Sequence, residues 1–303
     1  MRELFRVDVA GHLPVLSADG EVVGCAPFVY RVADGAVLDR IERLTSLSPD
    51  GTHAISAQQS GPVATVALHR VGGGVLRRET THEGLDWHVA WSPAGEHVAW
   101  SMRSGVVLWS VRDPARRAAL GRVNGRPRWI ATQTGARLLA YDLSSRRRAD
   151  HAMTLFAPDG SRAPFAGGHC AVHAVSPRGE RGLALRGSGE LAELDLASGA
   201  WLEGAGSTAP TITRVAWDPS GRAALVLRMD GDLRLWDVAG WRTERVIDPE
   251  RALIRRSWGP GAAAHQQIGV EHVKMAFSRD GERLLFVDGA AVVTAMTREG
   301  ERL

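Results

Sequence analysis

Ile212-Thr-Arg-Val-Ala-Trp217 is followed by Asp218-Pro-Ser-Gly221, by Arg222-Ala-Ala-Leu-Val-Leu-Arg228 and, after Met229-Asp-Gly231, by Asp232-Leu-Arg-Leu-Trp-Asp237. Three apolar runs of strand length are thus separated by proline, glycine and aspartate, and the third run alternates between apolar and polar residues. Proline presets φ at its position in such a turn, and glycine accepts the positive φ that other residues resist. The stretch therefore predicts a small antiparallel meander.

The same pattern occurs seven times along the chain, each time as a turn that ends in glycine between two apolar runs. Successive turn glycines are 31, 44, 40, 44, 42 and 60 residues apart. A period of this length is typical of a β-sheet unit that is repeated around an axis. We therefore predict an all-β fold, a seven-bladed β-propeller. The turn glycines are Gly20, Gly51, Gly95, Gly135, Gly179, Gly221 and Gly281.

The two ends of the chain predict how the ring closes. The last copy supplies apolar runs as far as Met296, which leaves too few residues for another turn and strand. Residues Glu3 to Val9 alternate in strand fashion and precede the first turn. We expect this segment to be the outer strand of the last blade, because pairing the two ends removes an exposed sheet edge. Residues 1–303 then form a single propeller domain.

Two third-strand runs, Leu108-Trp-Ser-Val111 and Leu235-Trp-Asp-Val238, end where WD40 repeats carry their Trp-Asp signature. The chain therefore resembles the WD40-repeat β-propeller family, in a degenerate, bacterial-type form. The resemblance covers almost the entire chain and implies a propeller fold. The turns are also similar to those of TolB-type propellers, but the Trp-Asp ends favour the WD40 family.

The resemblance also implies a buried tetrad of histidine, serine or threonine, aspartate and tryptophan in each blade. Ser101 and His82 are the candidate partners of Trp109, with Arg103 in the place of the aspartate. Asp230 is the candidate partner of Trp236, but no histidine precedes that copy. No copy carries the whole set, so the match to the family is partial.

The composition indicates one folded domain, because 303 residues with 44% hydrophobic content can bury a large core. No apolar run approaches the roughly 18 to 20 residues that span a bilayer. The N-terminal residues lack the apolar core of a signal peptide. We expect a cytoplasmic protein that makes no membrane contact. Cys25 and Cys170 fall in different blades, so we expect apolar thiols and neither a disulfide nor a metal ligand.

The charge pattern permits two interpretations. Lys274 is the only lysine among 37 basic residues, and the net charge is +3, which is weak support for a nucleic acid partner. Arginine-rich usage can reflect a GC-rich coding bias. Arginines gathered on one face would instead indicate an anionic partner, so their placement decides between the two interpretations.

The repeat predicts that placement. In a propeller of this type the glycine turns lie on one face, and the loops before the first strands and after the second strands lie on the opposite face. Arginine and tryptophan are enriched at interaction hot spots. We predict that this opposite face binds an acidic protein or peptide segment, with a solvated surface as the alternative. The predicted partner-binding residues are Trp87, Arg103, Arg126, Arg128, Trp129, Arg186, Arg214, Arg228, Arg255, Arg256 and Trp258.

Two departures from the period also stand out. About 20 extra residues, at roughly 248–271, separate the sixth and seventh copies, and such insertions are either functional loops or mobile tethers. The run Arg146-Arg-Arg148 falls between a second and a third strand. A solvated loop tip is the favoured interpretation of this run over a phosphate clasp.

An enzyme would require chemistry at the central channel. The expected first strands supply only His88 and His173 as ligand types, and His169 and His173 form a weak metal signal. No phosphate-binding loop, nucleophile turn or zinc helix occurs. We predict a noncatalytic interaction scaffold, a subunit or adaptor of a larger complex, without cofactor or metal. The alternative is an enzyme or a small-molecule- or metal-binding propeller that uses the channel.

Four tryptophans are predicted to be structural. Trp91 and Trp217 occupy equivalent first-strand positions, and Trp109 and Trp236 occupy equivalent third-strand positions. Because a binding residue has no reason to recur with the period of the fold, we expect these four side chains in the core between blades.

Overall fold

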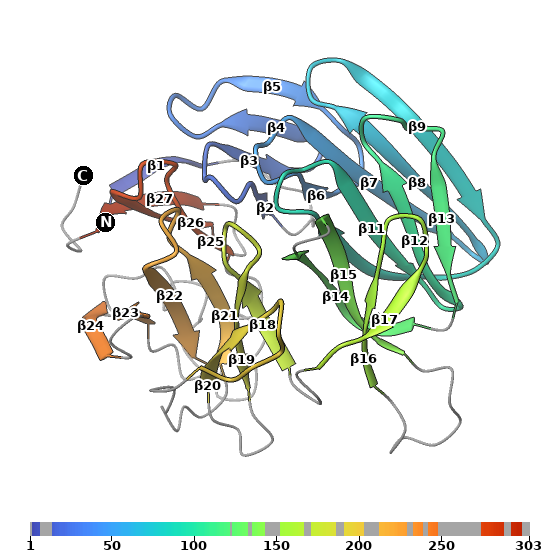
Figure 1. The fold of residues 1–303 in the computed structure, drawn as a ribbon. Helices are drawn as coiled ribbons and strands as arrows, with labels where there is room; N and C mark the ends of the chain where they lie inside the picture. The colour runs from blue at the N-terminus through green and yellow to red at the C-terminus, as the bar shows by residue number, and fades with distance from the viewer. Residues whose placement is uncertain are drawn as a thin grey trace, which may run out of the picture.

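The computed structural model describes residues 2–6, 14–121, 123–132, 135–142, 152–166, 171–185, 191–202, 212–228, 233–238, 242–247, 274–287 and 292–298. They form seven antiparallel sheets of three or four strands arranged around a central axis (Figure 1). The predicted all-β, seven-bladed propeller is therefore confirmed. Within these ranges no helix is long and apolar enough to cross a membrane.

The blades are numbered here in chain order. Blade 1 contains β2 (Val15–Leu16), β3 (Val22–Cys25), β4 (Phe28–Arg31) and β5 (Val37–Arg40); blade 2 contains β6 (Leu44–Leu47), β7 (His53–Ser60), β8 (Val63–Arg70) and β9 (Gly74–Thr81). Blade 3 contains β10 (Leu85–Trp91), β11 (His97–Met102), β12 (Gly105–Ser110) and β13 (Arg117–Leu120); blade 4 contains β14 (Val123–Thr132), β15 (Gly135–Asp142), β16 (Ala152–Phe156) and β17 (Arg162–Pro164). Blade 5 contains β18 (Ala171–Val175), β19 (Arg181–Leu185) and β20 (Leu191–Asp195); blade 6 contains β21 (Ile212–Trp217), β22 (Ala223–Arg228), β23 (Leu233–Asp237) and β24 (Arg242–Ile247). Blade 7 contains β25 (Lys274–Phe277), β26 (Arg283–Val287) and β27 (Val292–Thr297), with β1 (Arg2–Arg6) as its outer strand.

A buried polar side chain closes the turn between the first and second strands. In blade 2 the Ser48 hydroxyl accepts a hydrogen bond from the His53 backbone N–H at 2.9 Å and donates one to the Asp50 carboxylate at 2.7 Å. An unpaired backbone donor at this depth would be costly, so the small polar residue at the start of the turn has a structural role. The side chains that accept the equivalent bond from the residue five positions later, at 2.9–3.1 Å, are Ser17, Ser92, Ser176, Asp218 and Ser278.

The turns of neighbouring blades lie side by side. All seven turn glycines have positive φ, between 68° and 105°, as the sequence predicts. A Cβ placed on Gly281 would lie 3.6 Å from Cδ of Pro219 in the preceding turn. The Asp19 backbone N–H donates to the Pro49 carbonyl of the next turn at 3.1 Å. The turns therefore share one face of the disc.

An apolar cluster fills each interface between neighbouring blades, from the pair 1 and 2 to the pair 7 and 1. At the interface of blades 7 and 1, Leu285 and Val287 pack with Val23 and Cys25. Cys25 is fully buried, and burial raises the pKa of its thiol to about 12, which agrees with the predicted apolar role. Cys170 lies outside the described residues.

The N-terminal strand completes the last blade. β1 pairs antiparallel with β27, with Arg2 opposite Ala295 and Arg6 opposite Val292 (Figure 1). The expected strand covered Glu3 to Val9; β1 spans Arg2–Arg6, and residues 7–9 lie outside the described residues. This pairing and the apolar cluster between blades 7 and 1 join the two ends of the chain in one ring.

The four tryptophans assigned to the core lie there. Trp109, Trp217 and Trp236 are buried, and Trp91 packs against the cluster between blades 2 and 3. Their recurrence with the repeat therefore reflects packing between blades.

The candidate tetrad partners of Trp109 in blade 3 do not form a hydrogen-bonded set within the described residues. His82 is exposed, and the buried Ser101 hydroxyl makes no hydrogen bond within the described residues. The Trp109 indole N–H instead donates to the Glu79 carboxylate of blade 2 at 3.3 Å. The Arg77 guanidinium lies 5.1 Å from the centre of the Trp109 ring, so the indole is held by the neighbouring blade. Asp230, the candidate of blade 6, lies outside the described residues, as do 146–148 and the insertion at 248–271.

The interface of blades 7 and 1 can be tested by a pair of glycine substitutions. Gly20 and Gly61 have φ of 70° and 60°, so alanine at either position carries the left-handed penalty of about 1–2 kcal/mol. A Cβ on Gly20 would lie 2.3 Å from Cδ1 of Leu285 and 2.7 Å from the Phe277 carbonyl oxygen, whereas a Cβ on Gly61 meets nothing within 4 Å. We expect Gly20→Ala to lower the free energy of unfolding by about 1–3 kcal/mol more than Gly61→Ala, as measured by urea denaturation. Equal losses would contradict the described packing of blade 7 on blade 1.

Candidate functional site

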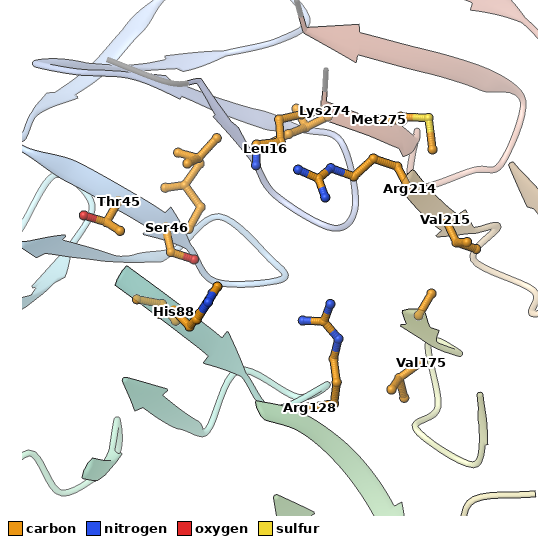
Figure 2. A pocket seen from close by; sticks show the side chains of 14 residues that line it. Leu16, Thr45, Ser46, His88, Arg128, Val175, Arg214, Val215, Lys274 and Met275 are labelled. Atoms are coloured by element: carbon orange, nitrogen blue, oxygen red, sulfur yellow. The ribbon is translucent and has the colours of Figure 1, made fainter. Parts of the chain in front are cut away.

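A cavity of about 570 Å³ occupies the centre of the ring. The innermost strand of every blade contributes to its wall, so the cavity is the central channel of the propeller (Figure 2). The lining residues are Val15, Leu16, Thr45, Ser46, Leu47, His88, Val89, Arg128, Ala174, Val175, Arg214, Val215, Lys274 and Met275.

Four basic residues line this channel, each from a different blade. They are His88 on β10, Arg128 on β14, Arg214 on β21 and Lys274 on β25. Figure 2 shows the guanidinium groups of Arg128 and Arg214 extending into the same open space. No carboxylate is among the described lining residues. The wall therefore carries a concentration of positive charge, which favours an anion inside the cavity.

The four basic residues occupy one equivalent position of the repeat. The last residue before the turn is Trp91 in blade 3, Trp217 in blade 6 and Phe277 in blade 7. The basic residue lies three positions earlier, at His88, Arg214 and Lys274. Arg128 stands in the same relation to Ala131 in blade 4. In these four blades that position lines the channel, so the fold gathers the four side chains around one cavity. Leu44 and Val172 occupy the equivalent position in blades 2 and 5, where they pack in the interfaces between blades.

The hydroxyl groups of the wall are oriented by their own hydrogen bonds. The Trp91 indole N–H donates to the Ser46 Oγ at 3.1 Å, so this oxygen acts as an acceptor there and its own proton can be donated to a ligand. The Thr45 hydroxyl instead donates to the Arg43 carbonyl at 3.2 Å. Apart from the basic and the hydroxyl side chains, the described lining residues are apolar.

The structure brings together only part of the predicted binding set. Arg128 and Arg214 line the channel, whereas the prediction placed them on the face opposite the glycine turns. Arg103 is exposed in the turn between β11 and β12, where its backbone N–H donates to the Gly84 carbonyl at 2.9 Å, and it does not line the channel.

Of the remaining predicted residues, Trp129 alone has a described side chain. Trp87, Arg126 and Arg228 have backbones in β10, β14 and β22, but their side chains lie outside the described part of the structure. The predicted residues that lie wholly outside the described ranges are Arg186, Arg255, Arg256 and Trp258.

Trp129 requires a correction. It is 3% exposed and packs in the cluster between blades 3 and 4, where its indole N–H donates to the Ala90 carbonyl at 3.0 Å. Its ring is stacked on His97, with 5.5 Å between the centroids, and burial lowers the pKa of that histidine. A side chain enclosed in this way does not reach a partner, so Trp129 belongs to the core.

Metal ligands can be assessed over part of the chain. β10 begins at Leu85, so Asp86 is a further ligand type on an innermost strand, besides the predicted His88 and His173. In the ranges that the structure describes, no group of three or more His, Cys, Asp or Glu side chains could hold a metal ion. His169 and the side chain of His173 lie outside those ranges.

Comparison with known proteins gives the fold class. No family model matches the sequence, and no curated protein matches it. Among solved structures, one chain of "Crystal Structure of Mitotic Checkpoint Complex" is similar over 96% of this chain and 89% of its own length, with a TM-score of 0.61 and 17% sequence identity. As many as 1209 solved chains match, so the propeller likeness by itself does not select a function.

The corrected assignment of Trp129 can be tested by substitution. We expect Trp129→Ala to lower the free energy of unfolding by about 3–5 kcal/mol, because it leaves a cavity between two blades and removes the indole hydrogen bond to the Ala90 carbonyl. Arg103→Ala, at an exposed position, serves as the control, with an expected change within about 0.5 kcal/mol. Chemical denaturation followed by tryptophan fluorescence and circular dichroism measures both. A loss as small as that of the control would show that Trp129 is not a core residue.

Proposed function

We propose that this protein is a noncatalytic, WD40-like interaction module of the cytoplasm, in which the central channel receives an acidic segment of a partner protein. One observation supports this proposal most strongly. Basic side chains from four blades line a single cavity that has no described carboxylate in its wall. The similar solved chain is part of a multi-protein complex, which agrees with a role in assembly.

The charge of the channel is large for this protein. Arg128, Arg214 and Lys274 contribute three permanent positive charges, and the formal net charge of the entire chain is +3. The other charges of the chain therefore nearly cancel. A cleft with one sign of charge focuses the electrostatic field and raises the rate of encounter with an oppositely charged partner.

Coding bias does not account for this arrangement. A GC-rich preference explains why the chain uses arginine in place of lysine. It does not explain why basic residues occupy the same repeat position in four blades, nor why the single lysine, Lys274, is one of them.

The closed ring supplies preorganisation. Because each basic residue lies on a strand of a blade that packs against two neighbours, its backbone position is fixed before binding. A partner then loses freedom mainly in its own segment, which lowers the entropic cost of association.

The proposal is tested with a fluorescently labelled peptide rich in glutamate and aspartate. We expect Arg128→Glu/Arg214→Glu to weaken binding at least about tenfold in fluorescence anisotropy titrations, since two attractive charges become repulsive. The matched control is Arg78→Glu/Arg116→Glu, which makes the same change of net charge at two exposed positions of blades 2 and 3.

The control variant is expected to retain its affinity within about threefold, because exposed charges distant from the site are screened by salt. Circular dichroism checks that both variants fold, and Arg128→Gln/Arg214→Gln is used if the charge reversal does not. Equal losses in the channel variant and the control would refute the channel as the binding site. Affinity purification from the native host, with the wild type and the channel variant as paired baits, then identifies the partner.

A second candidate function is supported by the size of the cavity. A volume of about 570 Å³ lies in the range of small-molecule sites, roughly 300–1,000 Å³. The channel would then hold a small anionic metabolite, as a binding protein or an enzyme. Elemental analysis of the purified protein and mass spectrometry of compounds released on denaturation distinguish this alternative, because a stoichiometric metal ion or small molecule would favour it.

A further inference from the structure

The number and the kind of groups in the channel restrict the anion that fits it. Three permanent cations and His88 face the cavity, together with the Ser46 hydroxyl. An anion with several oxygens can accept from donors that arrive from different blades, and a double negative charge suits a wall of basic side chains.

We propose that the channel binds a compact oxyanion of the phosphate class, carrying about two negative charges, between the guanidinium groups of Arg128 and Arg214. The proposal rests on the proposed function in one respect, because it places the anionic group of the ligand in the same cavity. Free phosphate and a phosphate ester on a partner side chain share this chemistry.

The placement of the two arginines favours a ligand that bridges blades. Arg128 comes from blade 4 and Arg214 from blade 6, and the described side chains that the intervening blade 5 contributes to the wall are Ala174 and Val175. Both guanidinium groups extend into the same cavity (Figure 2), so a ligand between them would bridge two blades. Guanidinium groups bind phosphate oxygens through paired N–H donors, which gives both charge and geometric complementarity.

The other donors act from further positions around the axis. Lys274 belongs to blade 7 and His88 to blade 3, while Ser46 is held in blade 2 by the Trp91 indole. A tetrahedral oxyanion presents oxygens in several directions. It can therefore accept hydrogen bonds from the arginines of blades 4 and 6 and from one of these three residues at the same time. A single carboxylate presents its two oxygens in one plane, so it reaches fewer of these directions.

The first experiment uses inorganic phosphate as the probe. Isothermal titration calorimetry in a buffer without oxyanions, at constant ionic strength, is expected to show one saturable site per chain, with no such signal for chloride. In Arg128→Gln/Arg214→Gln the dissociation constant is expected to rise at least about tenfold, because two charge-assisted pairs are lost. In the matched control Arg78→Gln/Arg116→Gln it is expected to stay within about twofold, since those exposed positions lie outside the cavity.

Lys274→Met keeps the length of the side chain and removes its charge, so it provides a second variant if the double substitution does not fold. It is expected to weaken phosphate binding about threefold to tenfold. The absence of saturable phosphate binding to the wild type would overturn the proposal. Equal effects in the channel variants and in the exposed control would also overturn it.

The second experiment separates the two sources of phosphate and distinguishes the proposal from the proposed function. A phosphoserine peptide and its glutamate counterpart are titrated against the wild-type protein, with and without saturating inorganic phosphate. Preference for the phosphopeptide, removed by free phosphate, supports a phosphate ester on a partner side chain. Binding of free phosphate without preference for the phosphopeptide supports a free phosphate ligand.

Failure of this inference has its own signature. If the glutamate peptide binds through Arg128 and Arg214 but inorganic phosphate neither binds nor competes, the acidic-segment function stands and the phosphate class is wrong. If phosphate binds in the channel and neither peptide does, the partner function is wrong and the anion site stands.

Discussion

The hydrogen bond that closes the turn between the first and second strands is the constraint on which the rest of the molecule depends. A buried serine or aspartate at the start of that turn accepts a bond from the backbone N–H five residues later in six of the seven blades. Blade 4 has Thr132 there, whose hydroxyl donates to the Gly135 carbonyl at 2.8 Å. The bond fixes the register of the innermost strand, and the packing of successive turns fixes the position of that strand about the axis.

The channel follows from this register. Once the turn sets where the innermost strand ends, the residue three positions before that end faces the axis in every blade that supplies a basic group. Four blades place His, Arg, Arg and Lys there, while the positions next to the turn carry large apolar residues such as Trp91 and Trp217. On the same strand, the position next to the turn therefore packs in the interface between blades, and the position three residues earlier places a basic side chain in the channel.

The sequence predicted the fold more completely than the site. Turn glycines and recurring tryptophans depend on local conformation and on packing, and both leave a periodic signal. Arg128 and Trp129 show why the site was harder to predict. They are neighbours near an expected loop, but β14 begins at Val123, so both lie well inside a strand. Successive side chains of a strand point to opposite sides, which directs Arg128 to the channel and Trp129 into the interface of blades 3 and 4.

The argument that a binding residue does not recur with the period also fails at the axis of a ring. There several blades contribute the same position, so a shared site is built from periodic residues. Lys274 and His88 share this position, so the periodic feature is a basic side chain and not one residue type. Residues 248–273, by contrast, lie outside the described ranges, and the role predicted for Arg255, Arg256 and Trp258 remains a prediction.

The most direct measurement of the central claim is anomalous diffraction from crystals soaked in selenate or tungstate, two oxyanions with strong anomalous signals. The account predicts the strongest peak inside the channel, within hydrogen-bonding distance of both the Arg128 and the Arg214 guanidinium groups, and its loss in Arg128→Gln/Arg214→Gln crystals. Peaks confined to the outer surface, with an empty channel in the wild type, would contradict it.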